Sequence, residues 1–263
     1  MERATERLLP IFVTLVCLTL IVPIVIVIVL AFSGQGFLKF PPDSLSMQWF
    51  ATFFGDARWQ ASLRSSVIIA AIACAIATCL GFFAAYAFVR RDFRGKRFVL
   101  SLMLLPIIVP TVITAIAMYF LSARLGLVGN MLWIGCCHAA LALPVVLLIL
   151  LSTLQGVDLN MERAALSLGS SWPRMMWRVV VPMAAPGIIS SALFAFLASF
   201  DELIVALFLT NAATQTLPVR IWNSLHLEIE PIIAAVSAFL IGVTAVILLL
   251  DSVLRGRRRP ARS

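Results

Sequence analysis

The stretch "ERAALSLGSSWPRMMWRVVVP", residues 162–182, separates two long apolar runs and carries a pattern of its own. Asp158 and Glu162 suit the start of a short helix. Acidic side chains there accept hydrogen bonds from unpaired backbone amides and interact favourably with the positive end of the helix dipole. Gly169 suits a left-handed cap at the end of that helix. Pro173 suits the first turn of a second helix. The stretch therefore predicts a helix-turn-helix between two apolar segments.

The second helix of this pair is expected to be amphipathic, with an apolar ridge at helical spacing. The ridge consists of Trp172, Met175, Met176 and Val179. Pro182 is expected to end the helix, since proline has no amide proton to donate. A helix pair of this kind either lies on lipid headgroups or docks into a groove of a partner protein. The residues by themselves leave both interpretations open.

The rest of the chain has the composition of a membrane protein. Of its 263 residues 62% are hydrophobic and 12% are charged, against roughly 45–50% and about 25% in soluble domains. Apolar runs long enough to cross a bilayer predict an all-α fold with six transmembrane helices in a single domain, residues 1–263. The expected spans are residues 11–32, 62–88, 98–122, 130–151, 184–210 and 231–253, and the helix pair falls in the connection at about 152–183.

The basic residues predict the orientation of these spans, because Lys and Arg accumulate on the cytoplasmic side. With the N-terminus inside, 15 of the 20 basic residues fall in cytoplasmic segments. Both termini are therefore expected in the cytoplasm. The arginines cluster at the ends of apolar runs, which is typical of contact with anionic lipid. They are not interleaved with exposed aromatic side chains, so nucleic acid is not expected as a partner.

Two acids, Asp201 and Glu202, interrupt the fifth apolar run directly after Ser199. A carboxylate inside the membrane is costly unless it is paired, hydrated or faces a cavity. One interpretation is a structural pair at a helix break or a contact to a partner subunit. The other is an anionic site on the path of a cationic solute. Pro106 and Pro110 predict a bent third span that lines a cavity, and this puts Thr111 on the same expected path.

His138 and the five cysteines also lie inside apolar runs. We expect His138 to form a hydrogen bond between helices. The cysteines are expected to be small core residues, and Cys136 and Cys137 beside His138 have no second ligand cluster. No metal, cofactor or catalytic residue is expected.

The spacing of the helix-turn-helix resembles the EAA loop of ABC importer permeases. That motif is Glu-Ala-Ala, three residues, Gly, nine residues, then Ile-x-Leu-Pro. The matching positions are Ala164, Ala165, Gly169 and, as conservative replacements, Val179, Val181 and Pro182. Arg163 stands at the position of the motif's glutamate, and Glu162 precedes it. The segments "ARLGLVGN", "HAALALP", "APGIISSALFAFLASFDELIVALFL" and "TLPVRIW" are similar to the spermidine/putrescine branch of this family.

The resemblance implies a type I ABC importer permease of the bacterial inner membrane, with the loop as a cytoplasmic coupling helix. Its implied ATPase contacts are Glu162, Arg163, Ala164, Ala165, Gly169 and Pro182. The implied partners are ATP-binding cassette subunits, a second homologous permease and an extracytoplasmic solute-binding protein. The implied solute is a polyamine or a related small amine, with Ser199, Asp201, Glu202 and Thr111 on its path.

The sequence also lacks a motif for binding ATP, as expected if a separate subunit hydrolyses ATP. No G-x-x-x-x-G-K-[ST] phosphate-binding motif occurs in the chain, so ATP chemistry must reside in another polypeptide and the chain is not expected to be an enzyme. The alternative function is a stand-alone secondary transporter or channel for a small cation. Such transporters commonly carry internal repeats with matched broken helices, and no repeat stands out here.

Overall fold

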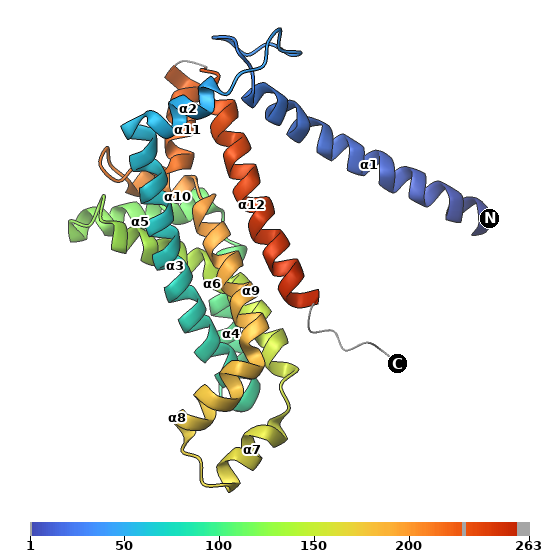
Figure 1. Ribbon diagram of the computed structural model, residues 1–263. Helices are drawn as coiled ribbons and strands as arrows, with labels where there is room; N and C mark the ends of the chain where they lie inside the picture. Colours follow the sequence, from blue (N-terminus) through green and yellow to red (C-terminus); the bar gives the residue numbers. More distant parts are fainter. Residues whose placement is uncertain (1, 228–229, 257–263) are drawn as a thin grey trace. The chain divides into compact units, whose positions relative to one another are not determined.

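The computed structural model describes residues 2–227 and 230–256 (Figure 1). Within these ranges the chain forms helices joined by turns, with one isolated antiparallel bridge between Ser33 and Leu45. Two compact units can be distinguished. The first comprises Met1–Gln60 and Arg220–Ala245, and the second comprises Ala61–Val219 and Val246–Ser263.

The first unit contains α1 (Glu2–Ala31), α2 (Gln48–Gly55) and parts of α11 (Leu217–Leu227) and α12 (Ile232–Gly256). Its small core joins Ala31 to Ala234 and Ala235, with Trp49 and Phe50 packed against them. Asp56 begins the next helix by accepting hydrogen bonds from the amides of Arg58 and Trp59. Burial alone would raise the pKa of Asp56, but these hydrogen bonds and the charge of Arg58 hold that pKa below its usual range.

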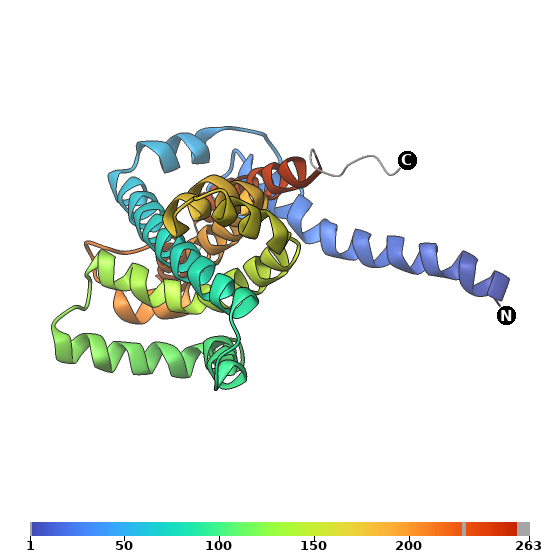
Figure 2. The ribbon, with the colours of Figure 1, turned by 90° about the horizontal axis from the view of Figure 1, so that it is seen from below.

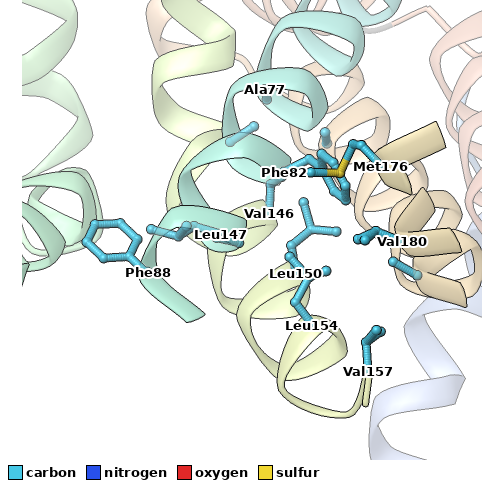
Figure 3. Packing of buried hydrophobic residues seen from close by; sticks show 14 of the residues in the cluster. Ala77, Phe82, Phe88, Val146, Leu147, Leu150, Leu154, Val157, Met176 and Val180 are labelled. Atoms are coloured by element: carbon cyan, nitrogen blue, oxygen red, sulfur yellow. The ribbon is translucent and has the colours of Figure 1, made fainter. Parts of the chain in front are cut away.

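The second unit is built on α3 (Ala57–Arg90), α6 (Met131–Gln155) and α9 (Val181–Phe200). Aliphatic and aromatic side chains from α3 and α6 meet those of the segment that leads into α9, as Figure 3 shows for Phe82, Leu150 and Met176. Gly187 of α9 packs directly on Thr153 of α6, and a Cβ at this glycine would clash with that threonine. The close approach explains why a glycine stands in the middle of a long helix.

Among the residues that the structure describes, five helices are long and apolar enough to cross a membrane, and a bent pair makes a sixth span when it is counted as one. The pair consists of α4 (Lys96–Leu104) with the 3₁₀ turn η1 (Leu105–Ile107), followed by α5 (Thr111–Leu125). The two parts meet at 98°. In Figure 2, α5 lies across the view while α4 is seen nearly end-on. The bend predicted from the two prolines in this span is therefore present.

The second helix of the loop does not end at Pro182, and that prediction is wrong. The helix α8 (Trp172–Met175) passes through a π-helical turn, η2 (Met176–Val180), directly into α9. The wider π turn places the amide of Val181 on the carbonyl of Met176. This gives the proline ring room against the preceding turn, where a regular α-helix would clash. The fifth span is thus a continuous helix, Trp172–Phe200, rather than residues 184–210.

Most side chains of the apolar ridge expected on this helix are buried in the core of the chain. Met175 and Met176 are buried in the core of the second unit, and Val179 packs against it. Trp172 alone keeps a substantial exposed fraction, 46%. Most of the ridge is therefore unavailable to lipid or to a partner protein.

Candidate functional site

The loop between α6 and α9 folds as the sequence predicts at its start and at its turn. The carboxylate of Asp158 accepts a hydrogen bond from the amide of Asn160 and caps α7 (Leu159–Ser167). Gly169 follows α7 with φ +83°, the left-handed conformation that favours glycine. The amide of Ser170 donates to the carbonyl of Ala165 at 3.1 Å, which closes the end of the helix. In Figure 1, α7 and α8 lie beside each other at the lower end of α3, α6 and α9.

Glu162 lies inside the protein rather than on the outer surface of the loop. It is 3% exposed, and its Oε1 lies 2.7 Å from both the Nε and an Nη atom of Arg90. The hydroxyl of Tyr86 donates to its other oxygen at 2.9 Å. Arg90 also donates to the carbonyl of Val157, just before α7. The acid of the loop therefore joins α7 to the end of α3.

Tyr86 also contacts the second helix of the loop. Its ring meets that of Trp172 edge-on, with centroids 6.2 Å apart. Tyr86 and Arg90 stand four residues apart on one face of α3, so this single face of α3 holds both α7 and α8. We define Glu162, Arg90 and Tyr86 as the loop clamp.

The remaining loop residues divide between the two sides of α7. Arg163 and Ala164 are exposed, whereas Ala165 is partly buried against the core. Gly169 faces open space, since a Cβ there would meet nothing within 4 Å. Pro182 lies beyond the loop, in the first turn of α9. Of the residues expected to contact an ATPase, Arg163, Ala164 and Gly169 thus lie on the outside of the loop, and Glu162 and Ala165 lie behind them.

The turn between α3 and α4 adds charge near the loop clamp. Asp92 accepts from Lys96 at 2.9 Å, and this hydrogen bond and the ammonium charge hold the pKa of Asp92 below its usual range. Arg91 and Arg94 in the same turn are exposed. The acid of this turn is therefore already paired with a lysine.

A second candidate site lies at the other end of α9, where the helix stops at Phe200. Residues Asp201–Leu203 break the helix, and α10 (Ile204–Leu209) follows. The Glu202 carboxylate accepts hydrogen bonds from the amides of Val205 and Ala206, each at 3.0 Å. Glu202 is thus an N-terminal cap of α10, in agreement with the structural interpretation of the acid pair.

His138 connects this break to α6. Its Nδ1 lies 2.8 Å from the hydroxyl of Ser199, and its Nε2 lies 3.6 Å from a carboxylate oxygen of Glu202. The ring is 1% exposed. The hydrogen bond between helices predicted for His138 is therefore present, and it brings Ser199 and Glu202 into one buried polar cluster.

Asp201 and Thr111 lie apart from this cluster. Asp201 is exposed and shares a face of α9 with the exposed Ala198, three residues earlier. Thr111 begins α5 and is half-buried; within residues 2–227 it shares no hydrogen bond with Asp201 or Glu202. Of the four residues expected on the solute path, the structure brings Ser199 and Glu202 together at His138, whereas Asp201 is exposed.

A cavity of about 480 Å³ lies between α6 and α9 nearer the loop. Its polar lining comes from Ser152, Thr153 and Ser190. Hydroxyl groups at membrane depth are tolerated where they meet water or protein. The hydroxyl groups of this cavity end at Ser190, and residues 192–198 between it and the break at Asp201 are apolar.

The sequence does not single out the partners of Glu162. Arg90 lies in a run of basic residues and has the pattern of an orientation signal. The available signal was the Tyr86–Arg90 spacing at the end of a span, opposite a loop in which Glu162 is the one acid between residues 159 and 182.

The fold and the two sites define a class, an all-α membrane protein with a broken span and a helical loop on one side. The family described as "Binding-protein-dependent transport system inner membrane component" matches residues 77–259. The chain belongs to this family. It is therefore a multi-pass inner-membrane component of an ABC importer, a transport subunit rather than an enzyme, and the match does not support a stand-alone transporter or channel.

Relatives in this family align with most of the chain. The spermidine/putrescine transport system permease protein PotC of Escherichia coli K12 is 26% identical over 238 residues, which cover 90% of each chain. PotC of Haemophilus influenzae is 27% identical and covers 92% of this chain and 94% of its own. The putrescine transport system permease protein PotI of Escherichia coli K12 is 29% identical over 77% of this chain and 74% of its own.

Solved structures agree on the type I permease fold. A chain of a bacterial ABC transporter that imports the acidic polysaccharide alginate superposes with a TM-score of 0.73. The superposition covers 97% of this chain and 96% of that chain, at 15% identity. A chain of an amino acid ABC transporter superposes with a TM-score of 0.57 over 81% of this chain and 99% of its own.

Proposed function

We propose that this chain forms half of the translocation path of an importer for a small amine-bearing cation, with putrescine and spermidine as the leading solutes. The observation that carries the proposal is the pair of acids at the end of α9, of which Asp201 is exposed and Glu202 is held by backbone amides. A carboxylate free at a break in a membrane helix attracts an ammonium group. The names of PotC and PotI support the same solute class.

In this assembly a second homologous permease completes the path, and an extracytoplasmic binding protein delivers the solute. Both termini lie in the cytoplasm. The outer residues of the loop, Arg163, Ala164 and Gly169, contact an ATP-binding cassette subunit, and Glu162, Ala165 and Pro182 hold the loop in place behind them. Asp201, Ser199, Glu202 and Thr111 belong to the solute path, with Asp201 as the direct contact.

The substitution Asp201→Asn tests the solute site. A lost charged hydrogen bond of about 1.5–3 kcal/mol lowers uptake about tenfold or more. Putrescine and spermidine uptake is measured in proteoliposomes with the binding protein and ATP, normalised to assembled complex. Asp43→Asn, in the exposed segment before α2, is the matched control. Uptake by Asp201→Asn at the level of this control contradicts the proposal.

The substitution Ala164→Trp tests the docking of the loop. A large side chain on the outer side of α7 prevents close approach of an ATPase subunit, while the core behind α7 is untouched. We expect the variant to insert normally and to lose the ATPase during purification. Retention of the ATPase at the wild-type ratio, together with normal uptake, contradicts docking through this surface.

A further inference from the structure

The charged side chains on the outward surface of the loop are all basic. Between residues 159 and 182 the chain contains three arginines, Arg163, Arg174 and Arg178, and all three are exposed. The acid of the same stretch, Glu162, is buried and paired with Arg90. The loop therefore presents an uncompensated cationic surface to whatever covers it.

The geometry of α7 separates the two neighbouring charges. Successive residues of a helix point about 100° apart. Glu162 points into the protein together with Ala165, three residues later. The outermost positions of α7 are Asn160, Arg163, Ala164 and Ser167, and all are exposed. Arg163 is thus the charged side chain at the centre of the outer face of α7.

The centre of this outer face is suited to close contact with another protein. A helix that lies in a bilayer surface inserts large apolar side chains, such as Trp, Phe and Leu, on its buried side. The most outward positions of α7 hold small or polar side chains, and exposed apolar side chains of Met161, Leu166 and Leu168 flank them. Small residues beside one arginine instead allow close approach by a complementary protein surface.

We propose that the ATPase subunit presents an acidic side chain to Arg163, and that Glu162 takes no part in this contact. This inference rests on the proposed docking of the loop to an ATPase. Opposite charges across an interface set the partner and its register, and like charges exclude the wrong partner. Glu162 is paired with Arg90 and Tyr86 inside the chain. The charge that α7 presents to the ATPase is therefore the positive charge of Arg163.

The loop clamp holds α7 in position against α3. Arg90 holds both Glu162 and the carbonyl of Val157, which is the residue before the cap of α7. A displacement of α7 by the ATPase therefore pulls on the end of α3. Glu162 is a positioning residue that transmits movement from the loop to α3.

The experiment compares three variants of the permease in the purified complex with its ATPase subunits. Arg163→Glu is expected to weaken ATPase retention at least tenfold, measured as the ATPase-to-permease ratio over a salt series. Arg163→Lys is expected to retain the ATPase. Glu162→Gln is expected to keep ATPase retention within twofold and to reduce the stimulation of ATP hydrolysis by the loaded binding protein.

Two charge reversals complete the test. Arg90→Glu with Glu162→Arg is expected to recover part of the stimulation that Glu162→Gln loses, because the ion pair re-forms in the opposite sense while the hydrogen bond from position 90 to the carbonyl of Val157 is lost. A photo-crosslinker at position 163 identifies the facing residue of the ATPase, and an acid at that place, replaced by Lys, is expected to restore retention of Arg163→Glu. Normal retention by Arg163→Glu, a basic or apolar crosslink partner, or loss of the ATPase by Glu162→Gln overturns the inference.

The control variant Ala164→Trp separates this inference from the docking on which it rests. If Ala164→Trp loses the ATPase while Arg163→Glu retains it, the loop docks and the charge assignment is wrong. If both variants retain the ATPase and transport normally, the loop does not dock, and the inference fails together with the proposed function.

Discussion

The imidazole Nδ1 of His138 lies 2.8 Å from the hydroxyl of Ser199, and this contact joins α6 to α9 one turn before the acids that break α9. Both side chains are buried. A buried polar group that loses its partner retains its full desolvation cost. The contact therefore positions the break at Asp201 relative to α6.

Ser199→Ala is expected to lower the free energy of unfolding by about 1–3 kcal/mol, because the ring nitrogen of His138 loses its partner. The melting temperature of the purified permease measures this change. Ser191→Ala is the matched control, since the buried hydroxyl of Ser191 donates to the carbonyl of Ile188 within its own helix. Equal melting temperatures for the two variants contradict the prediction.

Glu202→Ala is expected to destabilise the chain, whereas Asp201→Ala is not. Glu202 caps α10 through two backbone amides, and loss of a cap costs about 0.5–2 kcal/mol. Asp201 is exposed. Yield and thermal stability of the purified protein should therefore fall for Glu202→Ala alone. A larger loss for Asp201→Ala would reverse the assignment of the two acids.

Substitutions at Gly169 should rank by their tolerance of positive φ. Asn is expected to retain the most ATPase coupling, Ala less, and Pro none, because the proline ring fixes φ near −65°. A Cβ at this position meets no neighbour, so strain rather than crowding decides the order. Binding-protein-stimulated ATP hydrolysis is the measurement. Full activity of Gly169→Pro would exclude the left-handed cap.

Gly187→Ala should disrupt the packing of α9 on α6, because its Cβ would clash with Thr153. Overpacking typically costs about 1–3 kcal/mol. Gly242→Ala in α12 is the control, since a Cβ there meets nothing within 4 Å. It should be neutral or slightly stabilising, because alanine favours helix by up to about 1 kcal/mol over glycine. A melting temperature of Gly187→Ala equal to that of Gly242→Ala is the contrary result.

Reporter fusions test the orientation inferred from the basic residues. A periplasmic phosphatase fused at Gly34 should be active, and one fused at Ser263 should be inactive. The basic run that follows Gly256 lies outside the described residues, so the fusion at Ser263 is the direct measurement. Activity at Ser263 would place the C-terminus outside and contradict the prediction.

The sequence predicted the structural features that depend on residues adjacent in the chain. The cap at Asp158, the left-handed Gly169 and the bend at Pro106 and Pro110 each follow from the conformational preferences of the residues themselves. The apolar runs predicted the existence of spans for the same reason, since their length matches a bilayer, although the fifth span begins and ends earlier than predicted.

The elements that sequence reasoning missed depend on contacts between distant segments. Glu162 is separated from Arg90 by 72 residues, and no local pattern pairs them. Pro182 stays within a helix because a π turn before it provides room, which is a property of the packed segment. The substrate and ATPase contacts stay predictions, because they involve surfaces of other molecules.

The unbroken helix from Trp172 to Phe200 has a mechanical consequence. Its 29 residues span about 44 Å at 1.5 Å per residue. No flexible linker separates the loop from the span, because the helix continues through the π turn and Pro182 into α9. A tilt of a few degrees at the Trp172 end moves Asp201 at the far end by several ångströms. If the loop docks on an ATPase as proposed, a movement imposed at the Trp172 end is expected to reach Asp201 through a single helix.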